Sequence, residues 1–437
     1  MADRRRIVQL DKSRVWHPYT EMTRYRAEVE PLVVAEARGS RLVDADGKTY
    51  LDGNGSWWTC ALGHNHPRLV AALKQQAEQL CHTALAGIAH ENASELAEAL
   101  VSVAPDGLEH VFFSDNGSTS VEVAMKLALQ YWAQNGRPER TRFAALSDAF
   151  HGETLGVTAL GGVEVFRAPF DPVLLECAHL PSPGDPEVSL ERALDALETT
   201  VREGADSLAA IVLEPMVQGA AGMRIYDAAY LRRARELCDR HDVFLVSDEV
   251  FAGYGRTGTR WACDHAGIAP DVLCTAKAFT GGMLPMAATL ATERIFQGFL
   301  GDAERAFYYG HTFCGNPLGA AVAREVLRVY DEEHILERAK PKAARIAEAF
   351  AAMGKLPGVA RTRALGMIGA LDLEGGAGYL ADAGWRVYAE ARERGAYLRP
   401  LGNVVYVTPS LNIPDEDLDA LLAIARESVE AVARKGA

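Results

Sequence analysis

The chain has 437 residues, of which 49% are hydrophobic and 24% are charged, and its formal net charge is -14. This size and composition exclude a disordered or fibrous protein and predict a large globular chain with two domains. The negative charge argues against binding to nucleic acids or anionic membranes, because both depend on cationic patches.

The seven cysteines include no C-x-x-C pair, so neither a disulfide framework nor a zinc site is expected, and no metal is predicted. No apolar run approaches the roughly 18 residues that a membrane span needs, and the N-terminus lacks the apolar core of a signal peptide. The sequence therefore predicts a protein of a reducing compartment, the cytoplasm.

The predicted elements start with an irregular segment in which Arg4-Arg5-Arg6 is expected to be a solvated tail. Residues 32–52 alternate apolar and polar side chains around Asp46-Gly47, which predicts an antiparallel hairpin. Helices are expected over 68–80, 92–102, 118–134, 228–241 and 317–330, and strands over 111–114, 143–146, 209–213, 243–247 and 271–275. This alternation predicts an α/β fold with a largely parallel sheet covered on both faces.

The remainder of the chain predicts an α+β tail. Helices are expected over 335–354, 376–394 and 415–434, and strands within 358–373 and over 403–408. We therefore expect a large domain at 67–330, and a small domain formed by both chain ends, 1–66 and 331–437.

Two neighbouring strands deliver an acid and a lysine. The strand at 243–247 leads into Asp248-Glu249, and the strand at 271–275 leads into Lys277. Ligands of open α/β sheets bind at the carboxyl ends of the strands, so both side chains can meet one ligand. Pyridoxal phosphate needs this pair, an amine for its aldehyde and a carboxylate for its pyridine nitrogen. Either residue alone could equally belong to a surface salt bridge.

Other segments offer groups that suit the same ligand. Gly117 and Ser118 lie where a strand turns into a helix, and the free N–H groups of a helix N-terminus can hold phosphate. The rings of Trp57, Trp58 and Phe150 could wall a pocket or stack on a pyridine. Thr312 in a glycine-bounded turn could donate to phosphate, and Arg399 could bind a substrate carboxylate. The alternatives are helix caps, packed aromatics and a surface arginine.

Together these residues resemble the fold-type-I, class III aminotransferases that depend on pyridoxal phosphate. The resemblance rests on Asp248-Glu249-Val250, Gly253-Tyr-Gly-Arg256-Thr-Gly258, Lys277 and Gly281-Gly282, and it runs over nearly the whole chain. Within this family, the chain resembles the 7,8-diaminopelargonate synthases, which aminate 8-amino-7-oxononanoate in biotin biosynthesis. That narrower resemblance rests on Val15-Trp-His-Pro-Tyr19-Thr, Gly55-Ser-Trp57-Trp58 and Gly310-His-Thr312-Phe.

The resemblance implies a role for each matching residue. Lys277 would carry the cofactor as a Schiff base, and Asp248 would pair with the pyridinium nitrogen. The rest of the cofactor site would consist of Gly117, Ser118, Phe150 and Thr312. The substrate site would consist of Tyr19, Trp57, Trp58, Arg256, Gly310 and Arg399. Thr312 would reach the phosphate of the neighbouring subunit, so the enzyme would be a homodimer with shared active sites.

Two departures from the family pattern concern the amino donor. Many members have tyrosine before the His-Gly pair and aspartate after it, where this chain has Phe150 and Glu153. S-adenosylmethionine is the donor that the resemblance implies, and lysine is the alternative. A different class III aminotransferase, which transfers amino groups from ω-amino acids or diamines to pyruvate, is the rival interpretation.

Overall fold

The central element of the structure is a seven-stranded sheet with the strand order β4-β12-β11-β10-β7-β5-β6. The computed structural model describes residues 3–375 and 378–436. The strands of this sheet are β4 (Leu108–Ser114), β5 (Arg142–Leu146), β6 (Cys177–Leu180), β7 (Leu208–Leu213), β10 (Phe244–Asp248), β11 (Val272–Thr275) and β12 (Ala287–Thr292). β12 runs antiparallel to β4 and β11, and the other pairings are parallel. The prediction of an α/β fold with a largely parallel sheet is confirmed.

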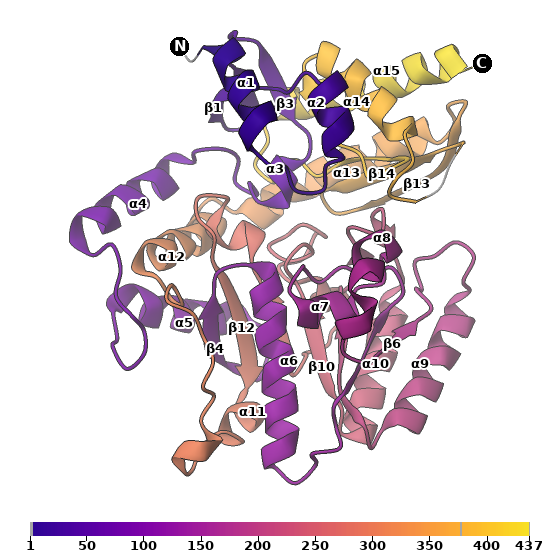
Figure 1. Cartoon of the computed structure of the whole chain (residues 1–437). Helices are drawn as coiled ribbons and strands as arrows, with labels where there is room; N and C mark the ends of the chain where they lie inside the picture. Colours follow the sequence, from indigo (N-terminus) through magenta and orange to yellow (C-terminus); the bar gives the residue numbers. More distant parts are fainter. Residues whose placement is uncertain (1–2, 376–377, 437) are drawn as a thin grey trace.

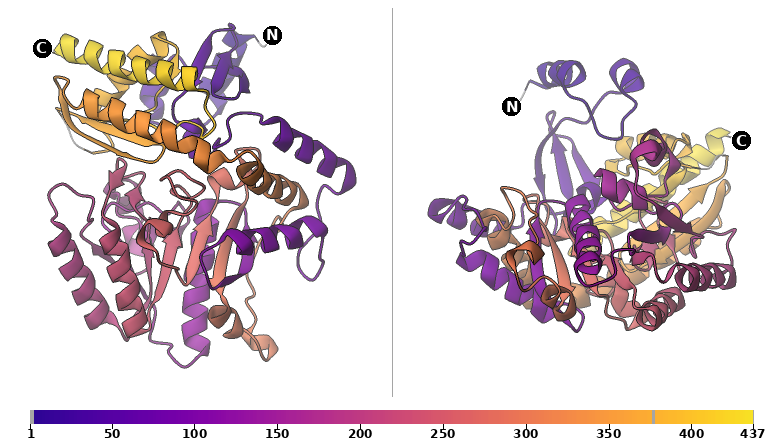
Figure 2. Two further views of the ribbon diagram at one scale, coloured as in Figure 1. Left: turned by 180° about the vertical axis from the view of Figure 1, so that it is seen from behind. Right: turned by 60° about the horizontal axis from the view of Figure 1, so that its bottom comes forward.

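Helices cover both faces of this sheet. In β10, Phe244 and Val246 belong to the apolar cluster that contains α6 (Gly117–Gln134), and Leu245 belongs to the cluster that contains α10 (Ala228–His241). This alternation follows from the two-residue period of a strand. Figure 1 shows α6 in front of the sheet, and Figure 2 shows the molecule from behind. Because both faces are covered, every residue of β7 is buried.

Two strands of the sheet were absent from the sequence prediction. β12 is built from alanine, threonine and a single leucine, so it lacks the large apolar residues that mark a buried strand. β6 has only four residues and lies at the edge of the sheet. The antiparallel direction of β12 follows from its short connection to β11, since a parallel pair needs a long crossover.

The two ends of the chain meet in a second sheet with the order β1-β2-β3-β15. Its strands are β1 (Val34–Arg38), β2 (Arg41–Asp44), β3 (Thr49–Asp52) and β15 (Ala396–Tyr397). β2 and β3 form the predicted antiparallel hairpin, and β15 pairs in parallel with β3. Figure 1 shows the indigo N-terminal and yellow C-terminal segments together above the central sheet. This pairing supports a small domain formed by both ends, whose exact boundaries stay a prediction.

The C-terminal segment contains the predicted helices and strands, with one boundary shifted. Its elements are α13 (Ile335–Met353), β13 (Val359–Leu365), β14 (Ile368–Leu373), α14 (Ala383–Glu393), β16 (Val404–Val407) and α15 (Asp415–Gly436). The helix expected from residue 376 begins only at Ala383, and residues 376–377 lie outside the described part of the chain. Gly378 has a φ of +87°, which a helix does not accommodate.

The expectation of an irregular N-terminus is wrong, whereas Arg5 and Arg6 are exposed to solvent as expected. Residues 4–14 form the helix α1 (Arg4–Arg14), whose first turn is capped by the side chain of Asp3, and α2 (Met22–Glu28) follows. None of the α1 residues is buried. An amphipathic pattern was therefore missing, and only the cap marked the start of the helix.

The remaining elements connect these layers. They are α3 (Gly55–Trp58), α4 (Pro67–Gln79), α5 (Glu91–Val103), α7 (Leu155–Leu160), α8 (Glu164–Arg167), α9 (Leu190–Gly204), α11 (Glu293–Gln297), α12 (Pro317–Glu332), the strands β8 (Val217–Gln218) and β9 (Arg224–Ile225), and the 3-10 helices η1 (Ala168–Val173), η2 (Ala262–Ala266), η3 (Lys277–Thr280) and η4 (Ala303–Arg305). Over the described residues, no helix is both long and apolar enough to cross a membrane.

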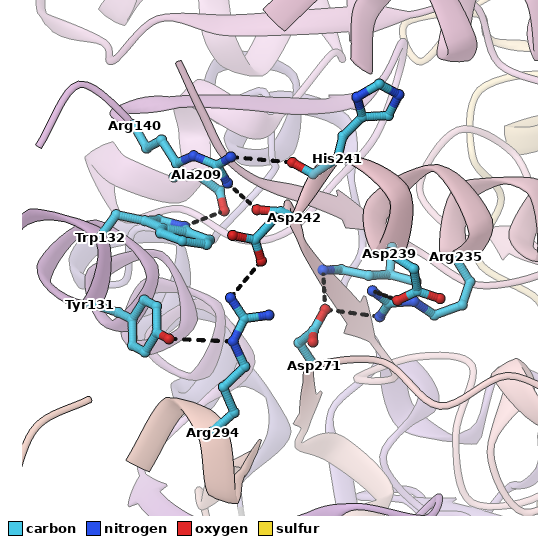
Figure 3. Close-up of polar contacts among 11 residues, drawn as sticks. Tyr131, Trp132, Arg140, Ala209, Arg235, Asp239, His241, Asp242, Asp271 and Arg294 are labelled. Carbon is cyan, nitrogen blue, oxygen red and sulfur yellow. Dashed lines mark hydrogen bonds and ion pairs between the residues drawn. The ribbon is translucent and has the colours of Figure 1, made fainter. Parts of the chain in front are cut away.

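A polar network ties the helices together at the amino ends of the strands (Figure 3). The buried Arg140 donates to the main-chain oxygens of His241 and Asp242 at the end of α10, and its guanidinium carbon lies 4.2 Å from the centre of the Trp132 ring. Arg294 donates to the Asp242 carboxylate. Cations at a helix C-terminus are favoured by the helix dipole. The network lies at the amino ends of the strands, where no candidate site residue lies.

Candidate active site

A cavity of about 650 Å³ lies at the carboxyl ends of the central strands. Its polar lining comes from the segments that follow four of them, and includes Ser118 after β4, Glu214 after β7, Asp248 at the end of β10 and Lys277 after β11. Parallel strands bring these segments to one edge of the sheet, where ligands of open α/β sheets bind. The acid and the lysine that the sequence singled out therefore line the same cavity.

Lys277 stands at the start of η3 in a left-handed backbone conformation with a φ of +48°. Its Nζ lies 5.0 Å from the centre of the Trp58 ring. Burial lowers the pKa of Lys277, and the charges of Asp248 and Glu214 oppose this effect. A lowered pKa increases the fraction of neutral amine, which is the form that attacks a carbonyl carbon or accepts a proton.

The Asp248 carboxylate is held on both oxygens. Its Oδ2 lies 2.7 Å from Nδ1 of the buried His151, and its Oδ1 accepts the main-chain N–H of Val250 at 3.1 Å. Burial alone would lower the pKa of His151, but the hydrogen bond and charge of Asp248 raise it. Asp248 is therefore a buried carboxylate whose direction is fixed by the His151 ring and the Val250 amide.

Glu214 is a cavity residue that the sequence analysis missed. It is buried and accepts the main-chain N–H groups of Phe150 at 3.0 Å and Gly219 at 2.9 Å. Burial raises the pKa of Glu214 to about 7, and the neighbouring charge of Asp248 acts in the same direction. The sequence contained a signal for it, because Glu214 directly follows an apolar run that forms a buried strand. Asp248 ends such a strand in the same way.

The N-terminus of α6 reaches the cavity at Gly117 and Ser118. Helix geometry leaves the first amides of a helix without acceptors within the helix, and here the Asn116 side chain accepts only that of Thr119. Ser118 Oγ accepts the main-chain N–H of Glu153 at 3.0 Å. The loop after β5 packs so closely that a Cβ on Gly152 would lie 2.1 Å from Ser118 Oγ.

Aromatic rings form the cavity wall opposite the sheet. Tyr19, Trp57, Trp58 and Phe150 all line it, as does Phe166, which the sequence analysis did not single out. The ring centres of Tyr19 and Trp57 are 5.4 Å apart. Burial and the hydrogen bond to Glu153 raise the pKa of Tyr19, which therefore stays a phenol and donates to that carboxylate at the exposed mouth.

Arg399 stands behind this wall. Its guanidinium carbon lies 4.8 Å from the centre of the Trp57 ring, and its main-chain N–H donates to Asn54 at 2.6 Å. Arg399 is not among the residues that line the cavity. A guanidinium stacked on an aromatic face keeps its edge free for a carboxylate.

The structure places three further predicted residues outside the cavity. Arg256 is buried and donates to the main-chain oxygens of Pro409 at 2.7 Å and Met367 at 3.4 Å, so the prediction that it binds substrate has no support in this placement. Burial lowers the pKa of Arg256 to about 10. Gly310 and Thr312 are exposed on the surface of the chain. Neither residue lines the cavity of its own chain.

The polar groups that line the cavity fit pyridoxal phosphate. The cavity offers the amine of Lys277, the buried carboxylate of Asp248 and the amide end of α6 at Gly117 and Ser118. These match the aldehyde, the pyridine nitrogen and the phosphate of the cofactor. Aromatic walls such as Phe150 suit its flat ring.

Comparison with known proteins agrees with this chemistry. The family model described as "Aminotransferase class-III" matches residues 23–429. A protein of Nitratidesulfovibrio vulgaris named adenosylmethionine-8-amino-7-oxononanoate aminotransferase is 42% identical over 99% of this chain and 83% of its own length. The crystal structure of a protein of that name from Methanocaldococcus jannaschii is 33% identical, with a TM-score of 0.94 over 98% of this chain and 99% of the other. An omega transaminase from Pseudomonas jessenii, solved in complex with PMP, is 26% identical, with a TM-score of 0.92 over 98% of both chains.

Proposed function

Because the chain belongs to the class-III aminotransferase family, we propose that this aminotransferase converts 8-amino-7-oxononanoate to 7,8-diaminopelargonate in biotin biosynthesis. One observation carries the proposal. The Lys277 amine lies 5.0 Å from the Trp58 ring centre, and the Arg399 guanidinium lies 4.8 Å from the ring centre of the adjacent Trp57. The adjacent tryptophans thus have an amine next to one ring and a cation next to the other, which suits an aliphatic chain that has a reacting carbon at one end and a carboxylate at the other.

Pyridoxal phosphate is the cofactor of the proposed reaction. Lys277 and Asp248 would hold its aldehyde carbon and pyridine nitrogen, and the amides of Gly117 and Ser118 would hold its phosphate. When bound, it supplies an electron sink next to the carbon that carries the amine. Phe150 would cover one side of the ring.

The side chains of the cavity move and hold the protons. Over the full reaction, Lys277 Nζ would accept a proton from the amine-bearing carbon of the donor and supply one to the carbon of the acceptor that gains the amine, for which its lowered pKa suits it. Asp248, oriented by His151, would hold a proton on the pyridine nitrogen of the bound cofactor. The aromatic wall excludes water from the reacting carbon. Donor and acceptor use the same cavity in turn, so the kinetics are ping-pong.

The mouth of the cavity favours an amino donor that carries positive charge. Glu153 accepts a hydrogen bond from Tyr19 there and keeps its other lone pairs for a ligand. S-adenosylmethionine meets this condition through its sulfonium and ammonium groups, and lysine meets it through its second ammonium group. S-adenosylmethionine is the proposed donor, with lysine as the alternative.

The enzyme works as a homodimer with shared active sites. Gly310 and Thr312 are exposed, and they lie between Tyr308, which is 80% exposed, and Phe313, which is 58% exposed. Large exposed apolar side chains next to a candidate phosphate donor suit contact with a second copy of the chain. Thr312 then completes the phosphate site of the neighbouring subunit.

The cysteines, which all carry free thiols over the described residues, agree with a cytoplasmic enzyme.

A product assay tests the proposed function. The purified enzyme with pyridoxal phosphate is given 8-amino-7-oxononanoate and one donor at a time, S-adenosylmethionine, lysine or alanine, and the products are identified by mass spectrometry. Formation of 7,8-diaminopelargonate with one of the first two donors is expected, and the Lys277→Arg variant should form none. No conversion of the oxononanoate, together with amination of pyruvate by a diamine or an ω-amino acid, would favour the rival aminotransferase.

A further inference from the structure

The two tryptophans of the cavity wall stand on a left-handed turn of the backbone. Ser56, Trp57 and Trp58 have φ values of +44°, +62° and +74°. Side chains other than glycine disfavour this region, and three such residues in succession need support from their surroundings.

A buried carboxylate provides this support. Ser56 Oγ donates to Asp52 Oδ2 at 2.9 Å, and His64 Nε2 lies 2.8 Å from the same oxygen. Asp52 is 3% exposed and ends β3, where this strand pairs with β15. The strand thus fixes Asp52, and Asp52 fixes the first residue of the turn.

A buried carboxylate is destabilised unless it is hydrogen-bonded, protonated or paired with a cation. His64 is the partner, and Cys60 Sγ lies 3.7 Å from its other ring nitrogen. Burial alone would lower the pKa of His64, but the hydrogen bonds to Asp52 and Cys60 raise it to about 10. His64 is therefore a cation at neutral pH, and the pair is an ion pair.

We propose that His64 is a positioning residue, which acts through Asp52 and Ser56 to fix the turn that presents Trp57 and Trp58 to the substrate. The inference rests on the proposed function in one respect, that these tryptophans wall the substrate pocket. His64 itself does not line the cavity.

The same turn also places the cation expected to bind the substrate carboxylate. The Arg399 main-chain N–H donates to the side chain of Asn54, two residues before the turn, and its guanidinium lies over Trp57. A displaced turn therefore moves the wall and Arg399 together. Since a misplacement of about 1 Å can cost on the order of 100-fold in rate, even a small shift is measurable as a change in substrate affinity.

Three variants and one control separate positioning from general packing. His64→Ala removes the ion pair, and His64→Gln retains a donor at the place of Nε2. Ser56→Ala breaks the second link and keeps the ion pair, so it serves if His64→Ala does not fold. The matched control is His66→Ala, since the His66 side chain is 11% exposed and that of His64 13%, but His66 faces Glu333 instead of Asp52.

The position of the turn is read from 19F NMR of the holoenzyme labelled with 5-fluorotryptophan. The chain has six tryptophans, and the variants Trp57→Phe and Trp58→Phe assign the two signals of the turn. In His64→Ala and Ser56→Ala, these two signals should shift and broaden while those of Trp16, Trp132 and Trp261 stay in place. The signal of Trp385 is left out of this comparison, because its ring centre lies 5.5 Å from the Arg399 guanidinium carbon. His64→Gln should return them toward their original positions, and His66→Ala should leave them unchanged. Unchanged signals in His64→Ala and Ser56→Ala would overturn the inference.

Kinetics with 8-amino-7-oxononanoate measure the consequence for the substrate. His64→Ala should raise KM about tenfold, change kcat and cofactor affinity less than about twofold, and recover in part in His64→Gln. If the two signals shift and KM does not, the turn is positioned as inferred, but the tryptophans do not wall the substrate pocket. That result contradicts the substrate site of the proposed function and the kinetic half of this inference.

Discussion

Asp248 is the residue on which the proposed chemistry depends, and its surroundings fix the direction of its side chain. His151 contacts one carboxylate oxygen at 2.7 Å, and the Val250 N–H contacts the other at 3.1 Å. Glu249, the next residue, is equally buried but accepts the amides of Ala262 and Cys263. Two adjacent acids thus have different tasks, one in the cavity and one in the loop that follows.

Replacement of Asp248 by Asn keeps the shape of the side chain and removes its charge. We expect kcat to fall roughly 10²–10³-fold, because the variant no longer stabilises a proton on the pyridine nitrogen. Steady-state kinetics of the folded, cofactor-loaded variant measure this loss. Glu249→Gln is the control and should change kcat less than about threefold once folded. A kcat of Asp248→Asn within tenfold of the parent enzyme would contradict the assigned role.

Glu214 makes the stability of the protein depend on pH. The folded state holds its proton up to a pKa of about 7, whereas the ordinary value is 4.5. Unfolding therefore releases a proton between pH 4.5 and 7, and the free energy of unfolding falls as the pH rises through this window. Relative to the Glu214→Gln variant, the parent chain should lose roughly 3 kcal/mol of stability between these limits. Urea unfolding of both cofactor-free proteins at a series of pH values measures the difference, and parallel curves would contradict the prediction.

At the scale of elements, the cavity depends on the contact between the N-terminus of α6 and the loop after β5. Gly152 has a φ of +129°, and a Cβ there would lie 2.1 Å from Ser118 Oγ and 2.6 Å from Ser118 Cα. Glycine is required because the loop approaches the helix too closely for any side chain.

Gly152→Ala should therefore push the loop away from the phosphate site. We expect the Kd for pyridoxal phosphate to rise at least about tenfold, as measured by spectroscopic titration of the cofactor-free protein. Gly87→Ala is the control, since Gly87 also has a positive φ, +82°, but nothing lies within 4 Å of its added Cβ. An equal Kd in both variants would show that the close contact is unimportant.

In the whole molecule, each active site is expected to use two chains. We expect Thr312→Ala to weaken cofactor binding in the homodimer, and Lys277→Ala to abolish turnover. A hybrid of one Thr312→Ala chain and one Lys277→Ala chain should contain one intact site, because the Thr312→Ala chain keeps its lysine and receives threonine from its partner.

The hybrid, purified with two different tags, should show about half of the parent activity per dimer at limiting cofactor concentration. If Thr312 serves its own chain instead, the hybrid has no intact site, and its activity will not exceed the mean of the two homodimers. A monomeric parent enzyme in sedimentation experiments would exclude shared sites altogether.

The site residues that directly follow an apolar run were predictable from the sequence. The apolar runs before Asp248 and Lys277 marked buried strands, and the topology of a parallel sheet brings their ends together. β12 was missed because alanine and threonine carry no periodic apolar signal. The direction of Arg256 was not predictable, because its acceptors, Met367 and Pro409, lie more than 100 residues away in the sequence. Whether such an arginine points into the cavity or into the protein interior depends on its burial, which only the folded structure shows.

The most direct test of the account is to locate the cofactor on the chain. Borohydride reduces a Schiff base to a stable amine, so the holoenzyme is reduced, digested and mapped by mass spectrometry. We expect a single pyridoxyl group, on Lys277, and none in the Lys277→Arg variant treated in the same way. A pyridoxyl group on another lysine, or labelling of the variant equal to that of the parent enzyme, would contradict the central claim that Lys277 carries the chemistry of this cavity.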